Sequence, residues 1–267
     1  MGVSWDSLWA IVEQTPATPE ERNQKPVGRA YNLRCVNEVL FQDRTDAGRM
    51  LARIVAAAPG LSDAIVLGLA RGGVPVAYQV AVTCGFPLDV IIVRKLGAPR
   101  CREFAMGAIA SGGAMVLNHD AVREFRVTEE QLRTLIDCQR NEIDRLETTY
   151  REGRPPAEFG DRGVILVDDG LATGASIRAA VRAVRPRAKQ VTIAVPVAAK
   201  SSIDEIAMEV DRVICVARPE RLEAVSLFYR DFSPTSDDEV RALLAEAGKR
   251  QGIGVREQGS GIKSDGL

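Results

Sequence analysis

Two adjacent carboxylates, Asp168 and Asp169, lie in the stretch of this sequence with the clearest chemical potential. They follow the apolar run Val164–Val167, and the small residues 170–176 come directly after them. We expect a helix over Ser176–Arg185, so its free N–H groups and positive dipole end would face this loop. Such a loop can wrap a phosphate, and the carboxylates can accept hydrogen bonds from vicinal hydroxyl groups. The combination suits a sugar phosphate.

A cation followed by two glycines lies after an earlier apolar run. Arg71, Gly72 and Gly73 follow the residues Ala64–Ala70. A guanidinium beside unobstructed backbone N–H groups is suited to a cluster of anionic oxygens. An ordinary glycine-rich turn is the alternative interpretation.

A second basic pair, Arg94 and Lys95, ends the β-branched run Leu88–Val93. The following residues, Leu96–Phe104, contain Gly, Pro and several charges without periodicity. We expect a loop here that could close over a substrate and exclude water. A solvated surface turn is the alternative.

Strand and helix patterns alternate from Phe41 onward, and they must position these motifs. Helices are expected over residues 43–58, 73–84, 128–150, 176–185 and 201–208, and after Ser236. Strands are expected over residues 64–70, 88–93, 104–110, 114–117, 164–167, 190–195 and 212–217. This alternation predicts right-handed βαβ units and a parallel sheet covered on both faces. Ligands of such sheets bind beyond the carboxyl ends of the strands, where all three motifs lie.

The segment Val164–Ser176, VILVDDGLATGAS, resembles the phosphoribosyl pyrophosphate motif of type I phosphoribosyltransferases. The resemblance implies that family's α/β fold, with a parallel sheet of about five strands, helices on both faces and a small hood. It also implies that Asp168 and Asp169 orient the ribose and hold Mg²⁺, directly or through water. The 5′-phosphate would be bound by Leu171, Ala172, Thr173, Gly174, Ala175 and Ser176.

The other motifs are similar to further parts of the same family. The sequence around Arg71 resembles its pyrophosphate loop, which implies a cis peptide bond at Ala70–Arg71. Arg94 and Lys95 are similar to the pair that opens its mobile catalytic loop. The resemblance implies that pyrophosphate is held by Ala70, Arg71, Gly72, Gly73, Arg94 and Lys95. It implies a catalytic set of Asp168, Asp169, Arg71 and Lys95.

The acceptor side of the resemblance is less specific. Phe228 and Tyr229 follow the last expected strand, where an aromatic ring could stack on a base, although core packing is the commoner use of such rings. Two acids of purine-specific members are absent, since Ala172 and Leu69 stand at their positions. The implied activity is transfer of phosphoribose from Mg²⁺-phosphoribosyl pyrophosphate to a nitrogenous base, purine or pyrimidine, with release of pyrophosphate. A non-catalytic sensor of phosphoribosyl pyrophosphate is the alternative.

Composition limits the other classes of function. The 267 residues carry a formal net charge of -1, which gives no electrostatic signature of nucleic-acid binding. Arginines do gather in Arg178–Lys189, but the solvated face of a helix explains them equally well. Five scattered cysteines favour reduced thiols in a cytoplasm, and the single histidine, His119, excludes a His-rich metal site. No window reaches the about 18 apolar residues that a membrane span needs.

The sequence divides into three regions. Residues 1–40 are expected to form an extension and linker, with a short apolar stripe at Trp5, Leu8, Trp9 and Val12. Residues 41–249 would form the phosphoribosyltransferase domain, and residues 250–267 a disordered tail. Members of the family are commonly homodimers, and the apolar stripe could serve such an interface.

Overall fold

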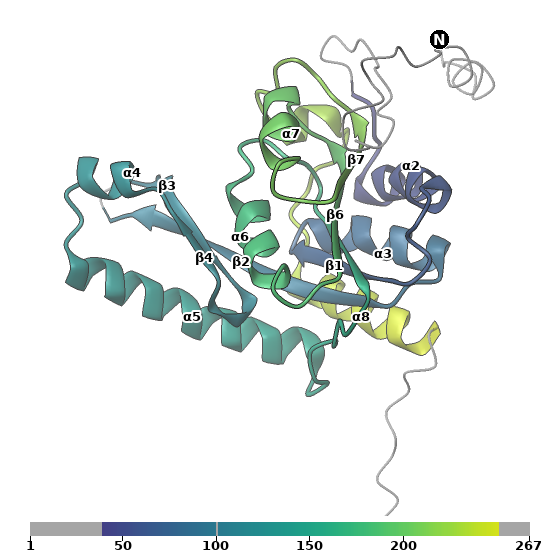
Figure 1. Cartoon of the computed structure of the whole chain (residues 1–267), viewed down its shortest axis with the longest axis horizontal. Helices are drawn as coiled ribbons and strands as arrows, with labels where there is room; N and C mark the ends of the chain where they lie inside the picture. Colours follow the sequence, from purple (N-terminus) through teal and green to yellow (C-terminus); the bar gives the residue numbers. More distant parts are fainter. Residues whose placement is uncertain (1–38, 100, 251–267) are drawn as a thin grey trace, which may run out of the picture.

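The computed structural model describes residues 39–99 and 101–250, and its centre is one mixed β-sheet (Figure 1). The strand order is β4-β3-β2-β1-β5-β6-β7. The strands are β1 (Ala64–Ala70), β2 (Leu88–Ala98), β3 (Cys101–Ala110), β4 (Met115–Leu117), β5 (Gly163–Val167), β6 (Gln190–Val197) and β7 (Arg212–Ala217). The strands β2, β1, β5, β6 and β7 pair in parallel, while β3 and β4 add antiparallel pairs at one edge. The predicted α/β architecture is confirmed, but the sheet has seven strands rather than about five.

Helices cover both faces of the sheet. They are α2 (Arg44–Ala57), α3 (Gly73–Cys84), α4 (His119–Glu124), α5 (Glu129–Arg151), α6 (Ala175–Val184), α7 (Lys200–Ile206) and α8 (Asp237–Arg250), with the 3₁₀ turns η2 (Ser111–Gly113) and η3 (Val225–Phe228). The helices α2, α3, α5 and α8 pack on one face, and α6 and α7 on the other. No helix in the described part of the chain is long and apolar enough to cross a membrane.

The strand residues are buried on both sides, which explains their continuous apolar sequences. In β1, Val66 packs toward α2 and α3, while Ile65 and Leu67 pack toward α6 and α7. Parallel pairing aligns the carboxyl ends of β1 and β5, because Gly68 lies opposite Val167. The residues that follow these two strands therefore meet at one edge of the sheet.

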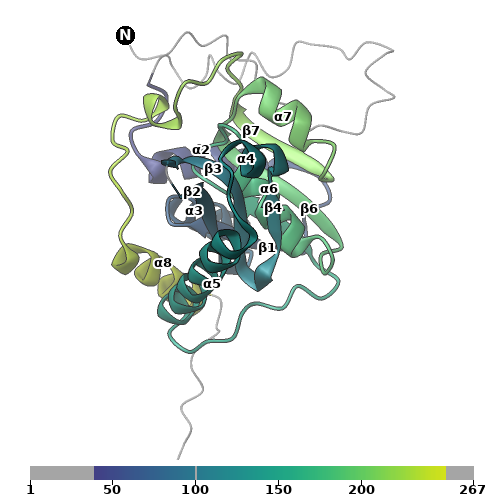
Figure 2. The ribbon, with the colours of Figure 1, turned by 90° about the vertical axis from the view of Figure 1, so that its left-hand side faces the viewer.

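The prediction of a loop over Leu96–Phe104 is wrong. The strand β2 continues past Val93 to Ala98 and forms a hairpin with β3, which starts at Cys101. Antiparallel partners need only a short connection, and the pairing is irregular at Leu96–Ala98, which hid the strand pattern from the sequence. With β4, α4 and the first half of α5, this hairpin forms a projection from the body that we call the arm (Figures 1 and 2).

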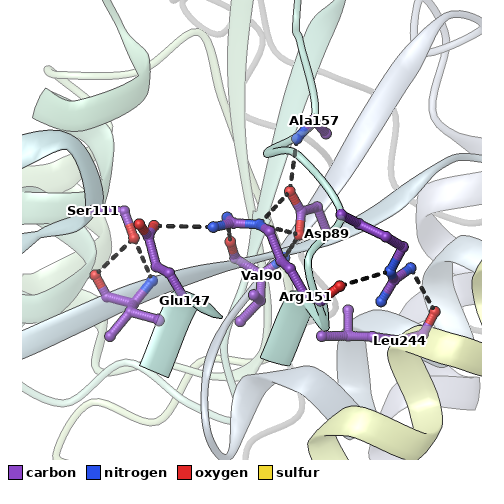
Figure 3. Close-up of polar contacts among 9 residues, drawn as sticks. Asp89, Val90, Ser111, Glu147, Arg151, Ala157 and Leu244 are labelled. Atoms are coloured by element: carbon purple, nitrogen blue, oxygen red, sulfur yellow. Dashed lines mark hydrogen bonds and ion pairs between the residues drawn. The ribbon is translucent and has the colours of Figure 1, made fainter. Parts of the chain in front are cut away.

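A buried ion pair attaches the end of α5 to the start of β2 (Figure 3). The Nε atom of Arg151 lies 3.1 Å from Oδ1 of Asp89, and its Nη2 donates to the carbonyl of Val90 at 2.9 Å. The backbone N–H of Ala157 donates to the second oxygen of Asp89 at 2.8 Å. Glu147 adds a further carboxylate at 3.2 Å from Arg151. The base of the arm is thus held on the body by a satisfied polar network.

Candidate functional site

The two acids at the end of β5 form the centre of the site. The backbone N–H of Asp169 donates to Oδ1 of Asp168 at 2.9 Å, which orients the first carboxylate. Both residues are only partly exposed, in the turn between β5 and the loop that leads to α6. A carboxylate has about four acceptor positions, so each acid retains capacity for further donors.

Two glycines bring the turn after β1 against the acid pair. A Cβ atom added to Gly72 would lie 2.1 Å from Oδ2 of Asp169, and one added to Gly73 would lie 2.6 Å from the carbonyl oxygen of Val167. Any side chain at these positions would therefore collide with the acids or their strand. The preceding bond, Ala70–Arg71, is cis, as the resemblance predicts. The first turn of α3 starts here and presents N–H groups at the same edge.

An arginine that the sequence analysis missed contacts the second acid. Arg44, the first residue of α2, places Nε 2.8 Å from Oδ2 of Asp169. Its Nη1 donates to the carbonyl of Ser233 at 2.7 Å, and its guanidinium lies 3.9 Å from the ring centroid of Phe232. No local motif marks Arg44, because 125 positions separate it from its acidic partner.

The acid pair has strongly perturbed electrostatics. Burial raises the pKa of Asp168 well above its ordinary value, and the negative charge of Asp169 raises it further. Burial also raises the pKa of Asp169, while the Arg44 guanidinium acts in the opposite direction. Lys95 lies near enough to favour the ionised form of Asp168. Two carboxylates in one poorly solvated place favour the arrival of a further cation or of hydrogen-bond donors.

The expected phosphate loop lies between these acids and α6. Leu171 is buried and forms a bridge with Ala198, whereas Ala172 and Thr173 are exposed. Gly174 has a φ of 76°, a left-handed conformation that favours glycine, and α6 begins immediately afterwards at Ala175. The hydroxyl of Ser202 donates to the carbonyl of Ala172 and ties the loop to α7. Exposed small residues before a helix N-terminus are suited to an anion.

Of the three basic side chains predicted for the site, the two arginines contact α5 and α8, whereas Lys95 is exposed on β2. Lys95 is exposed on β2 and acts electrostatically on Asp168. The Nη1 atom of Arg71 lies 3.6 Å from Asp237 at the start of α8, and Nε of Arg94 donates to Gln139 of α5 at 3.0 Å. The structure therefore brings Gly72 and Gly73 into contact with the acid pair, and the positive charge of Lys95 acts on Asp168 without a direct contact, while the two arginines face α5 and α8.

Phe228 and Tyr229 are core residues in this structure. Their exposed fractions are 1% and 5%, so neither ring offers a face to a base here, and the core-packing alternative describes both. The hydroxyl of Tyr229 donates to the backbone carbonyl of Asp169 at 2.6 Å. Burial raises the pKa of Tyr229 well above its ordinary value, so the hydroxyl remains a donor. Tyr229 therefore contributes to the site by supporting the turn that contains Asp168 and Asp169, a role that its sequence position did not predict.

A metal ion could be held here only with help from a ligand. Over residues 39–99 and 101–250, no group of three or more His, Cys, Asp or Glu side chains could hold a metal. The pair Asp168–Asp169 nevertheless fits Mg²⁺, which keeps several waters and often uses one or two carboxylates with substrate phosphates. Burial raises the pKa of both carboxylates, and a bound cation would offset this cost of desolvation.

Comparisons with known proteins converge on one family. The family model described as the phosphoribosyl transferase domain matches residues 42–231. Two curated proteins, from Mycobacterium tuberculosis strains CDC 1551 and H37Rv and provisionally named phosphoribosyl transferases, are each 43% identical over 209 residues. That alignment covers 78% of this chain and 47% of each relative, so the chain spans about half the length of the curated relatives it matches. A crystal structure of TT1426 from Thermus thermophilus is 41% identical, with a TM-score of 0.65, over 78% of this chain and 98% of that one.

Proposed function

Because the chain belongs to the phosphoribosyl transferase domain family, we propose that it binds Mg²⁺-phosphoribosyl pyrophosphate and transfers its phosphoribosyl group to a nitrogenous base. The acceptor class is a purine or pyrimidine, and pyrophosphate is the leaving group. One observation carries the proposal. The acid pair Asp168–Asp169 lies between a glycine turn that abuts it, at Gly72 and Gly73, and a phosphate-type loop at the start of α6.

Each part of this arrangement matches one part of the substrate. The carboxylates of Asp168 and Asp169 accept hydrogen bonds from the ribose hydroxyls and favour positive charge on the ring as pyrophosphate departs. The N–H groups at the start of α3 bind pyrophosphate oxygens beside Lys95. Residues 171–176 bind the 5′-phosphate at the start of α6. The protein thus contributes position and charge rather than a covalent intermediate.

Mg²⁺ would be held by substrate oxygens together with Asp168 and Asp169, through water or directly, and would offset the negative charge of the leaving group. The catalytic roles proposed for Arg71 and Lys95 differ in how the two side chains are placed in this structure. The positive charge of Lys95 already favours the ionised form of Asp168, whereas Arg71 must exchange its contact with Asp237 for the pyrophosphate. Half of the side chain of Arg71 is exposed, so this exchange needs no opening of the core.

The alternative of a regulator that binds nucleic acid receives less support. The basic cluster Arg178–Lys189 lies on and after α6, and its arginines have partners. Arg178 lies 2.8 Å from Glu205, Arg185 pairs with Asp211, and Arg187 lies over the ring of Phe159. These contacts occupy the arginines that a nucleic-acid backbone would need.

We also propose a cytoplasmic setting for the protein, which the free thiols at Cys84, Cys101, Cys138 and Cys215 support. The family's common homodimer stays a prediction.

The proposal is tested by titrating Mg²⁺-phosphoribosyl pyrophosphate into the wild type and an Asp168→Asn/Asp169→Asn variant by calorimetry. A panel of bases is assayed for pyrophosphate release with the same samples. We expect saturable binding by the wild type, a loss of at least about 100-fold in rate for the variant, and release with one base. Binding without release on any base would favour the sensor. Absence of binding by the wild type would refute the proposal.

A further inference from the structure

The segment before α2 and the segment after β7 run side by side at the acid pair. Phe41 forms a parallel bridge with Tyr229, and the N–H groups of Arg230 and Asp231 donate to the carbonyls of Phe41 and Gln42 at 2.8 Å. The ring of Tyr229 lies 5.1 Å from that of Phe41 and 4.9 Å from that of Phe232, measured between centroids. These two segments, far apart in sequence, form one joined unit over the acid turn.

Arg44 connects this unit to the acid itself. Only 11% of its side chain and 16% of that of Asp169 are exposed, so their contact at 2.8 Å is poorly screened by solvent. The guanidinium is held at three points: the carboxylate, the carbonyl of Ser233, and the face of Phe232. Such a planar group with fixed donors has one preferred orientation, and it imposes one on the carboxylate that it contacts.

The geometry of the contact leaves the acid able to bind a ligand. Arg44 engages Oδ2, the oxygen that faces Gly72, and the backbone carbonyl of Asp169 accepts from Tyr229. The carboxylate is therefore fixed from the side of the joined segments, while acceptor capacity remains for a hydroxyl donor. Arg44 itself does not need to touch the substrate.

We propose that Arg44 is a positioning residue that fixes the Asp169 carboxylate for the ribose and couples it to the segment 229–233. This inference rests on the proposed function, because it assigns Asp169 to the ribose hydroxyls. It predicts that a change at Arg44 weakens the binding of ligands that contain ribose more than the binding of Mg²⁺-pyrophosphate, which would reach Asp169 only through the metal ion.

The test compares two buried arginines of similar environment. Arg44→Lys keeps the positive charge but loses the fork of donors, and Arg151→Lys makes the same change in the distant pair with Asp89, where 8% of the arginine side chain is exposed. Calorimetry measures the dissociation constants of Mg²⁺-phosphoribosyl pyrophosphate and of Mg²⁺-pyrophosphate for both variants, and thermal unfolding gives their stabilities.

We expect Arg44→Lys to weaken phosphoribosyl pyrophosphate binding by about 10- to 100-fold and Mg²⁺-pyrophosphate binding, which contacts Asp169 only through the metal ion, by no more than about threefold. Arg151→Lys should lower the unfolding temperature and leave both dissociation constants unchanged. An unchanged affinity of Arg44→Lys for phosphoribosyl pyrophosphate, or an equal loss for both ligands, would overturn the inference.

A second variant covers the case in which Arg44→Lys does not fold. Phe232→Leu keeps Arg44 and Asp169 but removes the ring face on which the guanidinium rests. We expect about a threefold or larger loss for phosphoribosyl pyrophosphate and no matching loss for pyrophosphate. Wild-type affinity in this variant would contradict the coupling. Absence of binding by the wild type itself would instead refute the proposed function, so the two failures are distinguishable.

Discussion

At the scale of single residues, Gly72 occupies a tightly packed position in the site. Its φ of −60° is open to any residue, so only steric exclusion by the Asp169 carboxylate requires glycine. In Gly72→Ala the new methyl group must displace a carboxylate that Arg44 holds in place. We expect about a tenfold loss of affinity for phosphoribosyl pyrophosphate and a loss of stability of about 1–3 kcal/mol, measured by calorimetry and thermal unfolding.

Gly163→Ala is the matched control for this substitution. Gly163 starts β5, and a Cβ atom there would have no neighbour closer than 3.8 Å, an ordinary contact. Its affinity should equal that of the wild type. Equal affinities for Gly72→Ala and the wild type would show that the acid pair does not depend on the close approach of this turn.

The first acid should lower the stability of the unliganded protein. Burial raises the pKa of Asp168, so the folded state binds its proton more tightly than the unfolded state does, and stability falls as pH rises through the folded pKa. Asp168→Asn removes this ionisation and keeps an oxygen for the N–H of Asp169. We expect the variant to unfold at a higher temperature than the wild type near pH 7 while binding phosphoribosyl pyrophosphate less well.

The difference in unfolding temperature between Asp168→Asn and the wild type should increase with pH. It should be smallest below about pH 3, where the carboxyl is protonated in both states, and grow as the pH rises from there to the folded pKa. Thermal unfolding from about pH 3 to about pH 8 measures it. A wild type more stable than Asp168→Asn at neutral pH would contradict the assignment of a raised pKa.

At the scale of elements, local signals were predictable and long-range pairing was not. The helix expected over residues 128–150 is confirmed as α5, and its start is a local signal because Thr128 and Gln131 exchange hydrogen bonds within one turn. The acid pair and its loop were predictable because strand, loop and helix are consecutive. The extension of β2 into the hairpin depends on a partner strand, and the contact of Arg44 with Asp169 depends on the complete fold. Neither leaves a periodic pattern in the chain.

The arm should open more readily than the body. Among the described residues, its tip surrounds a cluster with three buried members, Ala98, Met106 and Ala121, whereas β1, β5 and β6 lie between large cores on both faces. Hydrogen exchange measured by mass spectrometry should therefore be faster for the amides of β4 and α4 than for those of β1, β5 and β6. Equal protection of these segments would show that the arm and body unfold as one unit.

At the scale of the whole molecule, the charge distribution argues against a nucleic-acid partner. The net charge is -1, and Arg178 and Arg185, two cations of the basic stretch on and after α6, are paired with carboxylates. We expect single- and double-stranded DNA and RNA to bind more weakly than about 100 µM at physiological salt, measured by fluorescence anisotropy. Tighter binding that weakens steeply with added salt would favour a nucleic-acid-binding regulator instead.

The strand β2 is shared by the body and the arm, and this has a mechanical consequence. It pairs with β1 up to Ile92 and with β3 from Val93 onward, so the change of partner makes a fulcrum between them. The first half of the 23 residues of α5 gives the arm a reach of about 17 Å, while Lys95 lies about 7 Å beyond the fulcrum. A rotation of about 5° would move the tip by about 1.5 Å and Lys95 by about 0.6 Å. A displacement of the far end of the arm would therefore move Lys95 by a distance between about two and three times smaller.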